Sequence, residues 1–219
     1  MSLERVLEPE VMDTVEDARD YDEMDHAAVN TLFIDDFLNT GFEGTGILDL
    51  GTGPARIPVE LCARIDGVRV MAVDAAASML ERARFHVEQA GLQDRVVLQQ
   101  IDAKQLPWED GMFDAVVSNS IVHHIPQPLD CLREAVRVTR PGGTLFFRDL
   151  MRPDNRQQLE DIVHRYAGQE NARAQQLFSE SLLAALTLDE IRELVRQLNL
   201  DPAGVTQTSD RHWTWTGQR

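Results

Sequence analysis

From residue 46 onward, short apolar segments alternate with longer helical ones, and no other feature constrains the fold of this chain as strongly. Strands are expected at 47–50, 68–73, 96–101, 113–118 and 144–148, with an Arg-Pro-Gly-Gly turn at 140–143 before the last of them. Helices are expected between them, one ending near residue 65 and the others at 76–90 and 128–138. The strands at 47–50 and 113–118 are nearly all apolar, as parallel strands covered on both faces should be. Successive units of this length predict right-handed crossovers and a doubly wound α/β sheet.

The alternation stops beyond residue 150. Residues 155–186 are expected to form one or two helices, and Thr187 begins another that ends near Asn199, with Glu190 in capping-box spacing. Two β-rich runs, 204–208 and 212–216, are joined by a link too short for a crossover, so they should pair as an antiparallel hairpin. The expected architecture is a Rossmann-like, doubly wound sheet of seven strands, mostly parallel with the last strand antiparallel.

The first 45 residues are acidic and are expected to form one or two helices. Near-helical spacing of Ala27, Ala28, Leu32, Phe33 and Phe37 predicts a face packed on the rest of the chain. Residues 1–40 carry twelve acidic and two basic side chains, which fits either a solvated face or an acidic lid that favours a cationic substrate. We therefore expect a helical lid, 1–45, on a domain formed by 46–219, the two making one structural domain.

Charge and composition exclude several classes of function. The net charge of −16 would repel a phosphate backbone, which disfavours nucleic acid as a partner. No apolar run approaches the roughly 18 residues of a membrane span, and the first residues lack signal-peptide character, so a cytoplasmic protein with no membrane association is expected. Cys62 and Cys131 have no nearby Cys or His at metal-ligand spacing, which predicts buried free thiols and no metal site.

Polar residues end four successive strands of the expected sheet. Asp49 and the Gly51-Thr52-Gly53 run close the first strand, Asp74 the second, Asp102 with Ala103 the third and Asn119 the fourth. Ligands of open α/β sheets bind at the carboxyl ends of strands, and glycines there allow close approach to the backbone. Asp74 can accept hydrogen bonds from two ribose hydroxyls, and Asp102 can accept one from an adenine amino group.

A nicotinamide dinucleotide site has a similar layout and must be weighed against this pattern. Its fingerprint requires a third glycine where this chain has Arg56, and its glycines admit a pyrophosphate to a helix N-terminus. Asp49, two residues before Gly51, suits a ligand that has an amino group and no phosphate. The sequence therefore favours an amino acid joined to a nucleoside, and a nicotinamide-dependent oxidoreductase is the weaker alternative.

These segments resemble the motifs of the class I S-adenosylmethionine-dependent methyltransferases, especially the ubiquinone/menaquinone methyltransferase-like branch that acts on small molecules. The resemblance covers roughly residues 20–216 and is carried by 47–53, 72–74, 102–103, 113–119, the His-His-Ile-Pro run at 123–126, and 140–143. It implies S-adenosylmethionine as cofactor, S-adenosylhomocysteine as product, and in-line transfer of the sulfonium methyl to a small-molecule acceptor. Ala55 departs from the motif, because many relatives have a third glycine there.

The resemblance also implies a set of cofactor-binding residues. The two glycines would line the methionine part, Met79 would pack on the adenine, and Tyr21 would close over the cofactor. The full expected set is Tyr21, Asp49, Gly51, Thr52, Gly53, Asp74, Ala75, Met79, Asp102, Ala103 and Asn119.

The acceptor side is less constrained. His123, His124 and His26 are candidate general bases, although relatives carry a similar His-His-x-Pro run irrespective of substrate. Arg148 and Arg152 could clamp an anionic acceptor or pair with the acidic lid. The acceptor, the methylated atom and the oligomeric state do not follow from the sequence, and a non-catalytic regulatory subunit that binds S-adenosylmethionine is a further alternative.

Overall fold

A computed structural model describes residues 3–8, 11, 13–14, 16, 18–19, 22 and 27–219. The chain divides into two compact units. The first unit is made from Met1–Glu10, Ser120–Pro128 and Arg148–Trp215, and the second from Val11–Asn119, Leu129–Phe147 and Thr216–Arg219. The expected division at residue 45 stays a prediction.

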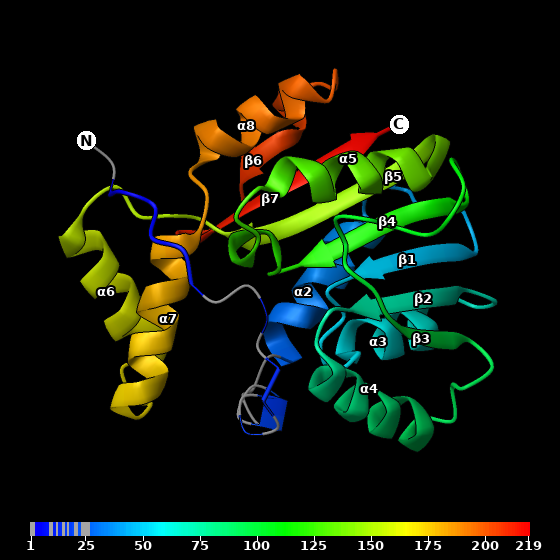
Figure 1. The fold of residues 1–219 in the computed structure, drawn as a ribbon, viewed down its shortest axis with the longest axis horizontal. Coiled ribbons are helices and arrows are strands. Elements are labelled where there is room, and N and C mark those ends of the chain that lie inside the picture. Colours follow the sequence, from blue (N-terminus) through cyan, green and yellow to red (C-terminus); the bar gives the residue numbers. More distant parts are fainter. Residues whose placement is uncertain are drawn as a thin grey trace. The chain divides into compact units, whose positions relative to one another are not determined.

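Seven strands form one sheet in the order β3-β2-β1-β4-β5-β7-β6. Neighbouring strands from β3 to β4 run parallel, and β6 and β7 form the antiparallel hairpin expected from the short link between them (Figure 1). The mostly parallel, doubly wound sheet is thus confirmed. The strands are β1 (Gly46–Leu50), β2 (Arg69–Asp74), β3 (Val96–Gln100), β4 (Phe113–Asn119), β5 (Thr139–Leu150), β6 (Val205–Gln207) and β7 (His212–Gln218).

The helices follow the expected rhythm, and the region 155–186 contains two of them. A capping box begins α8, in which the Thr187 hydroxyl accepts from the Glu190 amide and the Glu190 carboxylate accepts from the Thr187 amide. Within the described residues no helix combines the length and the apolar character that crossing a bilayer requires. The helices are α2 (Ala27–Leu38), α3 (Arg56–Arg64), α4 (Ala77–Gln89), α5 (Pro128–Val138), α6 (Arg156–Ala167), α7 (Ala172–Ala184) and α8 (Leu188–Gln197), with short 3-10 turns η1 (Val122–His124) and η2 (Pro202–Gly204).

The core of the second unit lies between the sheet and α2, α3 and α4. Phe33 and Phe37 of α2 are fully buried and contact Phe146 of β5, one edge-to-face and one tilted, with ring centroids 5.0 and 5.7 Å away. Ala27, Ala28 and Leu32, expected on the same face, are exposed, Leu32 by 55%, and Ile34 is buried instead. The sheet and the other two helices complete this core with Ile47, Leu61, Val70, Ala83, Ala115 and Val117.

The strand β5 begins at Thr139, which corrects the expectation of a turn at 140–143 and a strand from 144. Gly142 donates its amide to the Arg219 carbonyl, and the Arg219 amide donates to the Gly143 carbonyl. The two glycines thus form backbone hydrogen bonds with the last residue of the chain. The Pro-Gly-Gly sequence alone predicts a turn and not these bonds. Among the described residues, Cys62 and Cys131 are buried, and neither is part of a disulfide.

The first unit is held by its own small core. Leu150, at the end of β5, packs with Leu159 and Ile162 of α6 and Leu182 of α7. Leu3, in the N-terminal segment, packs against this cluster, and the Val6 amide donates to the Leu183 carbonyl. The start of the chain is therefore anchored to α7, which lies more than 170 residues later in the sequence.

Candidate functional site

The loop between β1 and α3 has an unusual backbone. Gly51, Gly53 and Ala55 all have positive φ, at 69°, 52° and 58°. Glycine adopts this conformation without strain, whereas a left-handed alanine costs about 1–2 kcal/mol. Ala55 is fully buried and takes the left-handed conformation that glycine adopts without strain.

Asp74 joins this loop to the next strand end. Its carboxylate accepts from the Gly53 amide at 2.8 Å and from the Ala76 amide at 2.9 Å. The Thr52 amide reaches the same strand end and donates to the Val73 carbonyl. The carboxylate of Asp74 therefore links the glycine loop to the residues that follow β2.

Asp49, the second-to-last residue of β1, is almost completely buried, at 1% exposure. Burial, together with the charge of Asp74, raises the pKa of Asp49 to about 7, and the nearby Thr52 hydroxyl offsets part of this rise. Asp49 Oδ2 and Thr52 Oγ1 have no hydrogen-bond partner among the described residues. A buried acceptor of this kind is costly unless a donor meets it.

Asn119 ends β4 next to this loop. The residue before it, Ser118, is in register with Leu50 of β1, and its hydroxyl donates to the Leu50 carbonyl. Asn119 Oδ1 is buried and also has no partner within the part of the chain that the structure describes. The ends of β1 and β4, two strands of the same unit, thus each present a buried oxygen that no described residue satisfies.

The predicted adenine side is more open. Met79 of α4 is 6% exposed and packs with Ala76, while Ala75 is exposed and its carbonyl accepts from the Gln100 side chain. Asp102 lies two residues beyond β3 and is half-exposed; it accepts from the Lys104 amide and forms an ion pair with the Lys104 ammonium. Ala103, between them in sequence, is partly buried.

Two predicted residues of the N-terminal segment, Tyr21 and His26, lie outside the described residues. Their neighbour Asp22 carries a role that the sequence did not reveal. Its buried carboxylate accepts from Arg56 of α3, from Arg82 of α4 and from His86 of α4 at 2.7 to 3.2 Å. Burial opposes ionisation, but His86 and the two arginines outweigh it and lower the pKa of Asp22.

A second acidic residue of the same segment caps α4. That helix has no side-chain cap of its own at Ala76. Asp13 supplies it from 65 residues upstream, because its carboxylate accepts from both the amide and the hydroxyl of Ser78 at 3.0 Å. At least two acids of the N-terminal segment therefore fasten it to α3 and α4 instead of only adding surface charge.

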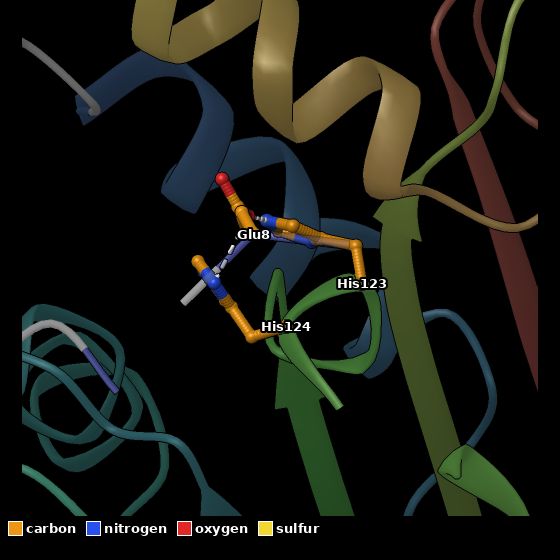
Figure 2. Close-up of side chains that lie close together, drawn as sticks. All are labelled: Glu8, His123 and His124. Atoms are coloured by element: carbon orange, nitrogen blue, oxygen red, sulfur yellow. Dashed lines mark ion pairs between the residues drawn. The ribbon is translucent and has the colours of Figure 1, made fainter. Parts of the chain in front are cut away.

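In the first unit, His123 and His124 meet two carboxylates. His123 is 4% exposed, and its Nδ1 lies 2.5 Å from Asp149. Glu8 Oε1 lies 3.4 Å from His123 Nε2 and 3.0 Å from His124 Nδ1. Figure 2 shows Glu8 opposite both imidazoles, each of which points toward its carboxylate. Burial opposes protonation of His123, but Asp149 and Glu8 outweigh it and raise its pKa.

Arg5 positions Glu8 by holding its segment in place. Its guanidinium donates to the Ala184 carbonyl at 2.7 Å, the Ile125 carbonyl at 3.0 Å and the His123 carbonyl at 3.2 Å. Nothing in the local sequence around Arg5 signals these partners, because they lie 118 to 179 residues away.

The two arginines expected to contact an acceptor are buried and bonded within the fold. Arg148 donates to the Thr214 hydroxyl. Arg152 donates to the Ala185 carbonyl and forms a 2.6 Å ion pair with Glu190, the capping residue of α8. Among the described residues, the acid that pairs with Arg152 thus belongs to α8 and not to the acidic lid. Whether either guanidinium touches an acceptor stays a prediction.

Comparison with known sequences identifies related proteins. A family described as a methyltransferase domain matches residues 48–147. The 27-O-demethylrifamycin SV methyltransferase of Amycolatopsis mediterranei (strain S699) is 30% identical over 180 residues, or 80% of this chain and 62% of that protein. The phosphatidylethanolamine N-methyltransferase of Cereibacter sphaeroides is 30% identical over 162 residues, or 74% of this chain and 77% of that protein. The chain therefore spans less than two thirds of the first of these relatives.

Comparison with solved structures gives the same fold. The crystal structure of a SAM-dependent methyltransferase from Aquifex aeolicus superposes with a TM-score of 0.68 over 93% of this chain and 97% of that one. The two sequences are 17% identical, so this likeness concerns the arrangement of strands and helices.

Proposed function

The chain belongs to the S-adenosylmethionine-dependent methyltransferase family, and from this premise we propose that it transfers the sulfonium methyl group of S-adenosylmethionine to a small-molecule acceptor. S-adenosylmethionine supplies a methyl group that is already activated, so the protein must hold an acceptor in line with the departing sulfur and exclude water. The two relatives named above act on small organic molecules by their names, which supports an acceptor of that class.

The burial of the Asp49 carboxylate at the end of β1 is the observation that supports the proposal best. Its Oδ2 is a buried acceptor without a partner among the described residues, at the end of β1 beside a glycine loop. The amino group of the cofactor's methionine part is a cation that can donate to it, and a cation there favours the ionised carboxylate that burial otherwise disfavours. The residues at this strand end therefore fit the group that the family uses.

The other strand-end residues take the roles expected from the sequence. Asp74, already fixed by two backbone amides, accepts from the ribose hydroxyls. Met79 packs on the adenine, and Asp102 and Ala103 lie at its rim. Asn119, whose buried Oδ1 has no partner among the described residues, faces the methyl-donor end of the cofactor. Gly51 and Gly53 line the methionine part, and Thr52 and Ala75 complete the proposed set.

A ligand-binding experiment tests the cofactor assignment. Calorimetric titration with S-adenosylhomocysteine should give one site, and Asp74→Ala should weaken it by at least about tenfold, because a charged acceptor of two hydroxyl hydrogen bonds is lost. Asp94→Ala, a change at an acid of the turn before β3, is the matched control and should bind like the parent. Equal affinity of Asp74→Ala and the parent would refute the assignment, as would binding of NADH instead.

Turnover separates an enzyme from a non-catalytic binding subunit. Incubation with methyl-labelled cofactor and a metabolite extract should give a labelled small molecule, whose structure identifies the acceptor atom.

A general-base role for His123 or His124 stays a prediction. It requires that His123→Ala or His124→Ala lower kcat by about 100-fold or more while S-adenosylhomocysteine still binds. A kcat within a few-fold of the parent in both variants excludes it. A cytoplasmic location also stays a prediction.

A further inference from the structure

Three side chains of the first unit, Glu8, His123 and His124, offer their free ligand atoms to one point. Glu8 Oε1, His123 Nε2 and His124 Nδ1 all lie within 4.8 Å of one another. The carboxylate oxygen is 3.4 Å from one nitrogen and 3.0 Å from the other. Ligand atoms about 2.0–2.1 Å from a tetrahedral Zn²⁺ are separated by about 3.3 Å, and the two distances from Glu8 Oε1 are close to this value.

The partners behind these residues fix which atoms face the centre. His123 Nδ1 is held by Asp149, so Nε2 is the nitrogen directed at Glu8. The other oxygen of Glu8, Oε2, accepts from the Ser181 hydroxyl at 3.1 Å, which leaves Oε1 for the histidines. A carboxylate behind a ligating histidine is the usual arrangement around protein metals, because it sets the tautomer and increases the basicity of the ligand.

Two atoms of the cluster are unsatisfied without a cation. Glu8 Oε1 and His124 Nδ1 are buried, and neither makes a hydrogen bond of acceptable geometry with any residue that the structure describes, despite their 3.0 Å separation. The side chains of Glu8, His123 and His124 are 10%, 4% and 20% exposed, so the cluster is mostly shielded from water. Buried polar atoms in this state are uncommon in native proteins, and a bound ion is one of the ordinary explanations.

We propose that Glu8, His123 and His124 bind a divalent transition-metal ion, with Zn²⁺ as the reference ion. Two imidazoles and one carboxylate form a ligand set suited to zinc or iron, whereas Mg²⁺ and Ca²⁺ prefer oxygen alone. Three protein ligands leave a fourth position open, as in zinc sites that accept water or a substrate group. The site differs from the sequence-based expectation of no metal, which considered only the cysteines and their neighbours.

The metal would connect distant parts of the first unit. Glu8 belongs to the segment that Arg5 ties to α7 and to the carbonyls around η1, and the two histidines belong to η1 itself. Coordination of one metal by Glu8 and the two histidines would link the N-terminal segment to η1 more strongly than the hydrogen bonds of Arg5 do. The proposal does not depend on methyl transfer, and the metal site and the cofactor site can be tested separately.

Zinc titration of the chelator-treated full chain tests the proposal. We expect one equivalent to bind, competing with a chromophoric chelator, and Co²⁺ in its place to give the intense visible absorption of a four- or five-coordinate site. His124→Ala and Glu8→Gln should each weaken Zn²⁺ binding by about 100-fold or more, since loss of an outer-shell partner alone costs 10- to 100-fold. Ser181→Ala, which removes only the partner of Glu8 Oε2, should cost about tenfold.

His164→Ala is the matched control, because His164 is an exposed histidine of α6 in the same unit. It should bind zinc like the parent. Zn²⁺ should also raise the Tm of the parent and of His164→Ala but not that of His124→Ala, by selective binding to the native state. Far-UV circular dichroism, measured on every variant, reports whether the fold is intact. Absence of stoichiometric binding to the parent, or binding that His124→Ala and Glu8→Gln leave unchanged, would overturn the proposal.

Discussion

A carboxylate buried as completely as Asp49, beside a second carboxylate, holds its proton up to a pH near neutrality. The sequence predicts the position of Asp49 at a ligand site but not its burial. The spacing of Asp49 before Gly51 indicated an acid at a ligand site, but the buried, unsatisfied Oδ2 depends on how Thr52 and Asp74 fold around it. The same holds for Asp22, whose three hydrogen-bond partners come from two helices.

The titration of Asp49 predicts how stability depends on pH. Its folded pKa of about 7 lies above the ordinary 3.8, so the native state binds the extra proton and the free energy of unfolding falls as pH rises from about 4 to about 7. The loss from this group reaches at most about 4 kcal/mol above pH 7. In Asp49→Asn this component disappears, so the variant should gain stability relative to the parent as pH rises across that window.

Urea unfolding of the ligand-free parent and variant at several pH values measures this difference, and other titrating groups cancel in it. A difference that stays constant from pH 4 to pH 8 would contradict the raised pKa. Asp49→Asn should at the same time bind S-adenosylhomocysteine more weakly, because the ligand's amino group loses an ionised acceptor.

At the scale of elements, local patterns located most helices and strands, and tertiary pairing moved some boundaries. The capping box at Thr187 and the hairpin of β6 and β7 occur where the sequence predicts them. β5 is longer than predicted, because its Pro-Gly-Gly segment pairs with Arg219 at the far end of the chain. The spacing of apolar residues indicates only local burial. It does not predict that a strand pairs with a residue as distant as Arg219.

Gly143 provides a test of this part of β5. A Cβ on Gly143 would lie 2.8 Å from the Asp114 carbonyl of β4 and 2.9 Å from the Arg140 carbonyl, and neither backbone atom can move without disturbing the sheet. Gly143→Ala should therefore lower the free energy of unfolding by about 1–3 kcal/mol.

Gly46→Ala, in β1 of the same sheet, is the matched control, because its nearest atom would be 3.6 Å away and its φ is ordinary. It should be close to neutral in a urea titration. Equal stabilities of the two alanine variants would show that the backbone at Gly143 is not confined as described.

At the scale of the whole molecule, each unit is assembled from segments far apart in the chain. The first unit brings the N-terminal residues to η1 and α7 through Arg5 and Glu8. In the second, Asp13 and Asp22 fasten the acidic N-terminal part to α3 and α4. The net charge of −16 therefore includes acids with a specific structural role.

Arg5 allows the first of these attachments to be measured. Arg5→Lys keeps the charge but cannot reach the carbonyls of Ala184, Ile125 and His123 together, because an ammonium is a single point on a flexible stem. We expect a loss of about 1–2 kcal/mol in unfolding free energy and faster proteolysis near the N-terminus. Glu4→Gln, an exposed neighbour, should change neither, and a similar effect of the two substitutions would argue against the attachment.

The sequence by itself determined the fold class, the family and the order in which polar residues end the strands. It could do so because strand and helix periods, glycine turns and strand-end acids are local properties of the chain. Only the tertiary structure decided that Asp49 is left unsatisfied, that Arg152 pairs with Glu190, and that Glu8 meets two histidines 115 residues away. These features are contacts between distant segments, and their energies depend on burial that no single stretch of sequence encodes.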